Sequence, residues 1–366
     1  MPASPLQSTT RAAFGPAHGR TSMLRPATLL PSRGDRRAAA RMTLSFGVPV
    51  MLLLAAGHPE LIIYAAFGSF VGMYGRDERH QLRLLHQGQA AGLLLGGALL
   101  GIFCAVADLG PWTLIGIEAL LAGTASLVAD RFGLKPTGPF FTIFAFGALA
   151  SVPPIAAWWG PACVSIAAAA FSVLVGFSGW VGKRSWHPGA ARAVVHPHAS
   201  AAAVHALRYV LAVGAAGSIG HLLGMGHPYW AMAAAAVPLA AETLNGRLRR
   251  GVHRVFGTFA GVGVTALILW PQPSVPMLAV AVLALMYPSE LFMQRHYGMA
   301  MAFFTPLILL MTLLAVTGDP SVLIRDRAVE TAVGALAGML VAVVIREPRR
   351  AGSAEALKPA EQHPLQ

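Results

Sequence analysis

The chain has 366 residues, of which 55% are hydrophobic and only 11% carry a charge. Roughly 25% of the residues in a soluble domain are charged, so the composition excludes an ordinary soluble protein and indicates an integral membrane protein. The formal net charge of +12 would suit a nucleic-acid partner, but the basic residues lie in short loops and the two tails, where membrane orientation explains them better.

The chain divides into five segments in order. The first 41 residues are rich in Pro, Ser, Gly and Ala, contain seven arginines and show no apolar periodicity, which predicts a disordered cytoplasmic tail. After this tail we expect a first membrane repeat, a cytoplasmic linker, a second membrane repeat and a second disordered cytoplasmic tail, at residues 42–181, 182–205, 206–345 and 346–366.

A membrane span requires roughly 20 apolar residues, and fewer where helices tilt. On this basis the sequence predicts an all-α polytopic protein with about twelve transmembrane helices, at residues 42–57, 59–75, 87–107, 111–130, 137–153, 160–181, 206–224, 228–244, 252–270, 275–291, 297–316 and 322–345. With the N-terminus inside, 25 of the 27 Lys and Arg fall in inner segments and none in outer loops. The positive-inside rule therefore predicts that both termini are cytoplasmic.

The two halves of the chain repeat short patterns. The matching pairs are His58-Pro59 with His227-Pro228 and Gly88 and Gly92 with Gly257 and Gly261, both at an offset of 169, and Phe140-Phe141-Thr142 with Phe303-Phe304-Thr305 at an offset of 163. Six spans in each half would bring both halves into the membrane from the same side. We therefore expect two parallel six-helix repeats.

A basic segment joins two apolar runs in the second half. It contains Arg247, Arg249 and Arg250, and Arg254 opens the run that follows. These guanidinium groups either attract organic anions to a cytoplasmic opening or only anchor the topology. Further along, Gly257 and Gly261 form a small-xxx-small pattern that predicts close packing against another helix.

Two other groups of charges lie inside predicted spans. Glu118 has no charged neighbour in sequence, so it is either a proton carrier or an acid that is hydrogen-bonded to a neighbouring helix. The last span begins with four charges and continues with small residues, and the positions concerned are Arg325, Asp326, Arg327, Glu330, Gly334 and Gly338. The charges either line an anion and proton path, with Arg327 on the substrate carboxylate, or form a structural Arg327–Glu330 ion pair. We expect the two glycines to pack against another helix.

Several sites are not expected. The two cysteines lie in apolar runs, so we predict no disulfide framework and no metal site. No HExxH, GxxxxGK[ST] or GxSxG motif occurs, which argues against an enzyme and against a bound cofactor. The tryptophans near span ends, Trp230 among them, are typical of an interfacial aromatic belt rather than of a ligand site.

The second half resembles the fusaric acid resistance protein-like family of bacterial membrane transporters. The residues that carry the resemblance are Pro228-Tyr229-Trp230-Ala231, the basic segment, Arg254-Val-Phe-Gly257-Thr258-Phe-Ala-Gly261, Phe303-Phe304-Thr305 and Arg325-Asp326-Arg327-Ala-Val-Glu330-Thr331-Ala-Val-Gly334. The resemblance is good over residues 207–345 and weaker over residues 41–180.

This resemblance implies an inner-membrane transporter in contact with the lipid bilayer. It implies export of small organic or aromatic acids, and we expect the export to be driven by a proton gradient. A passive organic-anion channel and a non-transporting membrane scaffold remain open as alternatives, as does a homo-oligomer. The resemblance does not specify the substrate.

Overall fold

The computed structural model describes residues 30–155, 157–181, 199–316 and 318–345. In these ranges the backbone forms α-helices and short 3₁₀ turns and contains no strand, which confirms the all-α prediction. The helices are α1 (Arg33–Ala55), α2 (Ile62–Ser69), α3 (His80–Val106), α4 (Pro111–Phe132), α5 (Phe140–Ala150), α6 (Trp159–Phe177), α7 (Ala199–Leu222), α8 (Pro228–Leu239), α9 (Leu244–Leu269), α10 (Val275–Phe292), α11 (Tyr297–Ala315) and α12 (Pro320–Val344).

Nine helices in the described ranges are long and apolar enough to cross a membrane, so the protein is a multi-pass membrane protein. Large apolar side chains are exposed on their outward faces, as lipid contact requires, and examples are Phe256, Leu267 and Leu340. The structure does not confirm twelve full-length spans. The helices that fall short are α2, α5 and α8, which have 8, 11 and 12 residues.

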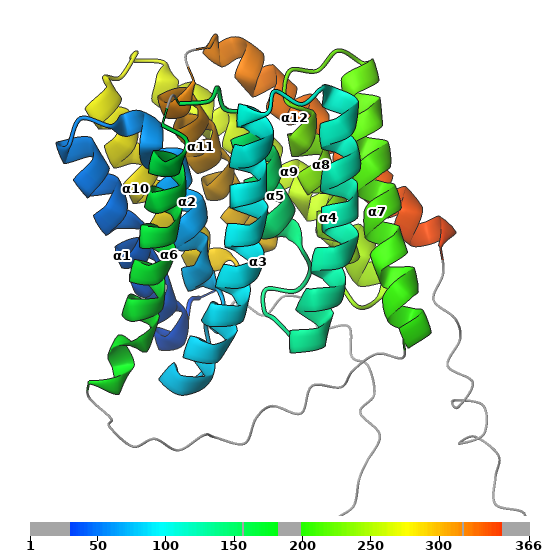
Figure 1. The fold of residues 1–366 in the computed structure, drawn as a ribbon, viewed down its shortest axis with the longest axis horizontal. Coiled ribbons are helices and arrows are strands. Elements are labelled where there is room, and N and C mark those ends of the chain that lie inside the picture. The colour runs from blue at the N-terminus through cyan, green and yellow to red at the C-terminus, as the bar shows by residue number, and fades with distance from the viewer. Residues whose placement is uncertain (1–29, 156, 182–198, 317, 346–366) are drawn as a thin grey trace, which may run out of the picture. The chain divides into compact units, whose positions relative to one another are not determined.

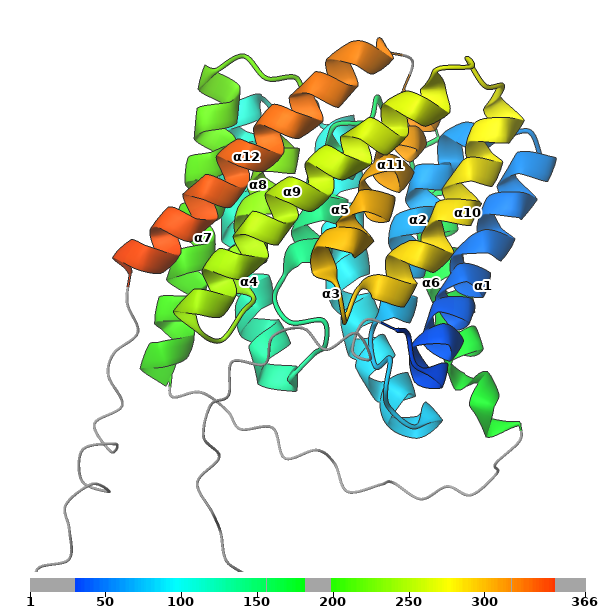
Figure 2. The ribbon, with the colours of Figure 1, turned by 180° about the vertical axis from the view of Figure 1, so that it is seen from behind.

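The three short helices lie inside the bundle. Nearly all their residues are buried, and Figures 1 and 2 show α5 and α8 enclosed by longer helices on both sides. A short helix is tolerated at membrane depth when protein, rather than lipid, surrounds the irregular backbone at its ends. The loops beside α5 and α8 support each other, because Thr137 Oγ1 donates a hydrogen bond to the Ala240 carbonyl oxygen at 2.9 Å.

Several helices begin earlier than the hydropathy pattern predicts. α1 starts at Arg33 instead of residue 42, because Ser32 and Asp35 form a capping box that satisfies the first backbone N–H groups. Residues 33–41 are therefore helical and do not belong to a disordered tail. Residues 1–29 of that predicted tail, most of the predicted linker (182–198) and the C-terminal tail lie outside the described residues.

The basic segment was expected to be a connection between two spans, but it forms the first turns of α9. Thr243 caps this helix, since its hydroxyl accepts a hydrogen bond from the Gly246 backbone N–H at 3.1 Å. α9 therefore extends from the basic end of the segment into the apolar run without a break, and Arg254 lies three turns inside it.

Long helices from the two halves pack against each other in reciprocal pairs. α1 of the first half packs against α10 of the second half, and α4 packs against α7. Within each half, a short helix packs on the last helix: α2 on α6, and α8 on α12. Figure 2 shows α10 beside α1 at one end of the bundle and α12 beside α7 at the other. α5, α8 and α11 lie in the interior, between the α1–α10 pair and the α4–α7 pair.

Glycines permit the closest helix contacts. A Cβ on Gly257 would meet the Gly298 carbonyl oxygen of α11, and a Cβ on Gly261 would lie 2.6 Å from Thr305 Cβ. In α12, Gly334 and Gly338 lie against the backbone carbonyls of α8. Side chains at these positions would force the helices apart.

The first half uses different glycines from those that the 169-residue offset predicts. Gly88 and Gly92 have no neighbouring atom within 4 Å of an added Cβ. Instead, Gly97 and Gly101 of α3 contact the backbone of α5, and Gly97 faces Thr142. The close-packing face of α3 therefore lies at Gly97 and Gly101 and not at the two glycines that the 169-residue offset aligns.

Candidate functional site: buried donors and carboxylates

Arg327 lies in the interior of the bundle without a counter-ion in hydrogen-bond contact. Its side chain is fully buried, and none of its three guanidinium nitrogens has a hydrogen-bond partner among the described residues. The guanidinium group lies over the rings of Trp230 and Phe144, at 5.0 and 5.9 Å from their centroids. Cation–π contacts offset only part of the loss of hydration, so this arginine is poised to bind an anion.

Arg254 of α9 is also fully buried and has nitrogens without a partner among the described residues. Its Nη1 donates to Tyr297 Oη at 3.4 Å and contacts Met301 Sδ at 3.0 Å, whereas Nε and Nη2 have no hydrogen-bond partner in the described part of the chain. The guanidinium lies 5.1 Å from the centroid of the Phe140 ring.

The two arginines share one aromatic pair. Phe140 and Phe144 are one turn apart on α5, with ring centroids 5.6 Å from each other. Arg254 lies over the first ring and Arg327 over the second, near enough for their positive charges to repel each other. This repulsion adds to the free energy that a bound anion would recover.

Four other buried donors on α8, α9, α11 and α12 also lack a hydrogen-bond partner among the described residues. They are Trp230 Nε1, Thr258 Oγ1, Thr305 Oγ1 and Thr331 Oγ1. Thr258 and Thr331 follow Arg254 and Arg327 by one helical turn, so each shares a face with its arginine. We call the six residues that offer these unpaired groups the donor cluster: Trp230, Arg254, Thr258, Thr305, Arg327 and Thr331.

The donor cluster has the chemistry of an anion site. Unpaired buried polar groups are rare in folded proteins, and each one costs free energy. Guanidinium, indole and hydroxyl groups can all donate to a carboxylate, and the phenylalanine rings beside them can contact an aromatic ring. The arrangement therefore fits a small acid with a planar apolar body.

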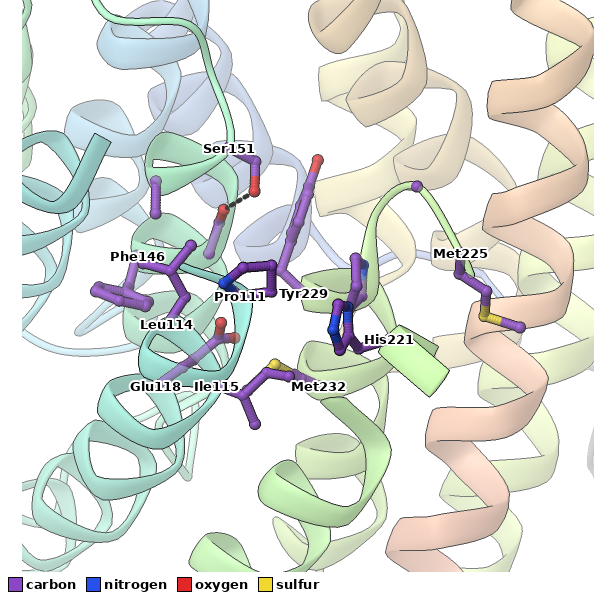
Figure 3. Close-up of a pocket in the computed structure, with 14 residues that line it drawn as sticks. Pro111, Leu114, Ile115, Glu118, Phe146, Ser151, His221, Met225, Tyr229 and Met232 are labelled. Carbon is purple, nitrogen blue, oxygen red and sulfur yellow. Dashed lines mark hydrogen bonds between the residues drawn. The ribbon is translucent and has the colours of Figure 1, made fainter. Parts of the chain in front are cut away.

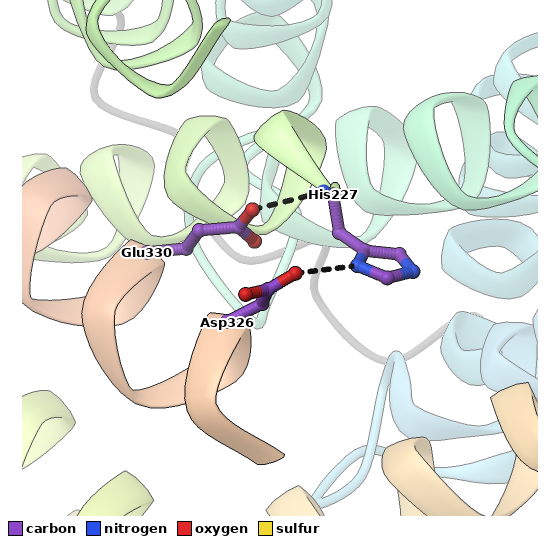
Figure 4. A group of neighbouring side chains, drawn as sticks. All are labelled: His227, Asp326 and Glu330. Carbon is purple, nitrogen blue, oxygen red and sulfur yellow. Dashed lines mark hydrogen bonds and ion pairs between the residues drawn. The ribbon is translucent and has the colours of Figure 1, made fainter. Parts of the chain in front are cut away.

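Carboxylates lie at the start of α12 and contact the start of α8 (Figure 4). Glu330 Oε1 accepts a hydrogen bond from the His227 backbone N–H at 2.9 Å, and Asp326 Oδ2 lies 3.6 Å from His227 Nδ1. Asp326 Oδ1 pairs with Arg325 Nη2 at 3.2 Å. Among the described residues Arg327 and Glu330 form no direct ion pair: Glu330 Oε1 accepts from the backbone before α8, and the Arg327 guanidinium has no hydrogen-bond partner.

Glu118 of α4 lies at a cavity of about 230 Å³ between α4, α5, α7 and α8 (Figure 3). It is 2% exposed, and its Oε1 has no hydrogen-bond partner among the described residues. Tyr229 lines the same cavity, and its ring stacks near Phe144, with centroids 6.3 Å apart. Tyr229 thus lies between the cavity and the donor cluster.

The arginines at the start of α9 are in different environments. Arg247 is buried and donates from Nε to the Ala241 carbonyl oxygen at 2.8 Å, whereas Arg249 is exposed. Arg250 lies over the Tyr297 ring at 4.9 Å. Arg254 belongs to the donor cluster and not to this basic surface.

The aromatic residues of the site were not predicted from the sequence. Trp230 was predicted to lie in the interfacial belt, but it is fully buried, whereas Trp112, Trp158 and Trp270 are more than half exposed. Phe140 and Phe144 were not selected at all, although the repeated Phe-Phe-Thr pattern includes the first of them. Their role depends on contacts between helices that are distant in sequence.

Comparison with known proteins confirms the resemblance in the second half. Residues 211–341 match the profile described as "Fusaric acid resistance protein-like". The chain is also similar to the "Uncharacterized membrane protein YvaC" of Bacillus subtilis (strain 168), at 28% identity over 138 residues. That alignment covers 37% of this chain and only 22% of the relative. No solved structure matches the chain.

Proposed function

We propose that this protein exports small organic acids, among them aromatic carboxylates, across the inner membrane by exchange for protons. The observation that carries the proposal is the donor cluster, in which two fully buried arginines have no anionic partner in hydrogen-bond contact. A carboxylate bound there would receive charge-assisted hydrogen bonds and remove the repulsion between the two guanidinium groups. The match of residues 211–341 to a family named for resistance to an organic acid supports the same substrate class.

A continuous series of contacts links the basic start of α9 to the donor cluster. Arg250 lies over the Tyr297 ring, and the Tyr297 hydroxyl contacts Arg254. Arg254 and Arg327 are then joined through the Phe140–Phe144 pair. We propose that an anion enters at the exposed Arg249, moves along this series and leaves toward α12. Each step exchanges one cationic or aromatic neighbour for the next, so the anion never loses all of its stabilising contacts.

Two buried carboxyl groups suit proton transfer in the opposite direction. Glu118 and Glu330 each have one oxygen without a hydrogen-bond partner among the described residues, so each can take up a proton without breaking an existing contact. Glu118 lies at the cavity beside Tyr229, and Glu330 lies one turn beyond Arg327. A proton and an anion that use neighbouring groups provide a physical basis for coupled movement.

We also propose that the chain crosses the membrane twelve times in two parallel six-helix repeats, with both termini cytoplasmic. In this arrangement each short helix completes its crossing through the loop at its end. The reciprocal packing of α1 on α10 and of α4 on α7 supports the repeat, because the fourth helix of each half contacts the first helix of the other.

Flux measurements test the proposal and separate it from the two alternatives. Protein in liposomes should accumulate labelled benzoate only when a proton gradient is imposed, and Arg327→Gln should lower the initial rate at least tenfold. Arg79→Gln is the matched control, because Arg79 is exposed, precedes α3 and does not belong to the donor cluster. A benzoate current in the absence of a proton gradient would indicate a channel, and no flux by the wild type would indicate a scaffold. Either result contradicts the proposal.

A further inference from the structure

Three potential metal ligands converge where the chain turns into α8. His227 precedes the first residue of α8, and Asp326 and Glu330 are one turn apart on α12. One ligand atom from each residue lies within 4.8 Å of those from the other two. Figure 4 shows all three side chains directed toward the same point.

This group holds a buried acceptor atom that no donor satisfies. Glu330 Oε2 is buried and has no hydrogen-bond partner in the described part of the chain, whereas His227 Nδ1 makes a long contact of 3.6 Å with Asp326 Oδ2. Glu330 is fully buried and Asp326 is 5% exposed. The donor cluster offers unpaired donors, whereas this group offers carboxylate oxygens and an imidazole nitrogen, which is the ligand set of a cation site.

The remaining atoms of the group are held in place from outside. Glu330 Oε1 accepts from the His227 backbone N–H at 2.9 Å, and Asp326 Oδ1 pairs with Arg325 at 3.2 Å. The His227 ring stacks on Trp230, with centroids 4.5 Å apart. These contacts orient the three potential ligands, as hydrogen bonds and packing around the ligand side chains do in known metal sites.

A bound cation would also balance the charge of this group. Two buried carboxylates this close repel each other strongly unless a positive charge lies between them. Arg325 contacts only Asp326, and the guanidinium of Arg327 is directed onto Trp230 and Phe144.

We propose that His227, Asp326 and Glu330 bind a divalent transition-metal ion of the Zn²⁺ class. One imidazole nitrogen and two carboxylate oxygens form a donor set that Zn²⁺ accepts, at distances of roughly 2.0–2.2 Å. This site is distinct from the donor cluster but shares Glu330 with the proposed proton path, so a bound ion and a proton would compete for Glu330 Oε2; the existence of the site does not depend on anion transport.

Zinc titration of the purified protein tests the site. The tag-free protein, freed of metal and kept in detergent, is titrated with Zn²⁺ against a chelating dye. The wild type should show one tight site, and Glu330→Gln, Asp326→Asn and His227→Gln should each weaken it at least tenfold. His58→Ala is the matched control: His58 Nδ1 also contacts a carboxylate, at 3.0 Å from Glu60 Oε1, but the pair is exposed and has no third ligand. This variant should bind Zn²⁺ as tightly as the wild type does.

Two results would overturn the proposal. One is an unchanged tight site in all three ligand variants, and the other is a wild type that binds no more Zn²⁺ than the triple variant does. A measurement on the wild type alone covers the case in which the variants fold poorly. Crystals soaked in Zn²⁺ should show an anomalous peak between the start of α8 and α12, and the absence of a peak there would also contradict the site.

Discussion

At the residue scale, the central feature is the environment of Arg327. A fully buried guanidinium normally meets a carboxylate or several carbonyl oxygens, but here its contacts are the faces of two aromatic rings. Trp230 contributes more than its ring, because its Nε1–H is buried beside the arginine without an acceptor. Arginine and indole together offer donors to one ligand from two helices, α8 and α12.

Trp230→Phe should separate the donor from the ring. The substitution keeps an aromatic face under Arg327 and removes the N–H group together with part of the indole ring, and we expect the fold to persist. A hydrogen bond to a charged group contributes roughly 1.5–3 kcal/mol, which corresponds to a loss of about tenfold or more in anion affinity. Calorimetric titration with benzoate measures this loss. Trp112→Phe, at an exposed tryptophan, should bind as the wild type does; equal losses in both variants would argue against a role for the indole N–H.

The charged members of the site could be predicted from sequence, whereas the aromatic members could not. A charge within an apolar run is conspicuous, and this is how Glu118, Arg254 and Arg327 were identified. An aromatic residue near a span end fits the membrane interface and the bundle interior equally well. Only the packing of α8 between other helices places Trp230 inside.

At the element scale, the short helices explain why hydropathy gave the right segments with wrong boundaries. α5 and α8 are surrounded by protein, so they need not reach the length that lipid would require. The charged first turns of α3 and α9 lowered the local hydropathy, so the sequence placed their starts at residues 87 and 252, whereas the helices begin at His80 and Leu244. Hydropathy averaged over a window of sequence combines these effects, so it does not tell how long a helix is from how thick the membrane is.

The contact of α9 with α11 gives a prediction at this scale. Gly257→Leu would insert a side chain against the backbone of Gly298, and overpacking of this kind costs about 1–3 kcal/mol in soluble cores. We expect a lower midpoint of thermal unfolding for the purified variant. Gly263→Leu is the control in the same helix, since an added Cβ there has no neighbour within 4 Å. Similar melting of both variants would show that the close contact at Gly257 does not stabilise the bundle.

At the scale of the whole molecule, the proposed orientation in the membrane rests on the distribution of charge. The Lys and Arg outside the last span gather in the predicted inner segments, and the start of α9 is among them. The proposed direction of transport depends on this orientation, because the basic surface at Arg249 must face the cytoplasm to collect substrate.

Cysteine labelling tests the orientation. In a background with Cys104→Ala and Cys163→Ala, single cysteines replace Ser274, in the turn before α10, or Asn245, at the start of α9; both positions are exposed. A membrane-impermeant maleimide added to intact cells should label the cysteine at position 274 and leave the one at position 245 unlabelled until the cells are opened. The reverse pattern would invert the topology and the direction of transport.

The proposed transport requires that the donor cluster bind an organic anion, and an equilibrium binding measurement tests this binding most directly. Purified wild-type protein in detergent should bind radiolabelled benzoate at one saturable site. Arg327→Gln should lower the affinity at least tenfold, while Arg79→Gln should leave it unchanged. Equal affinity of a folded Arg327→Gln variant and the wild type would contradict the assignment of the buried arginines to the anion site.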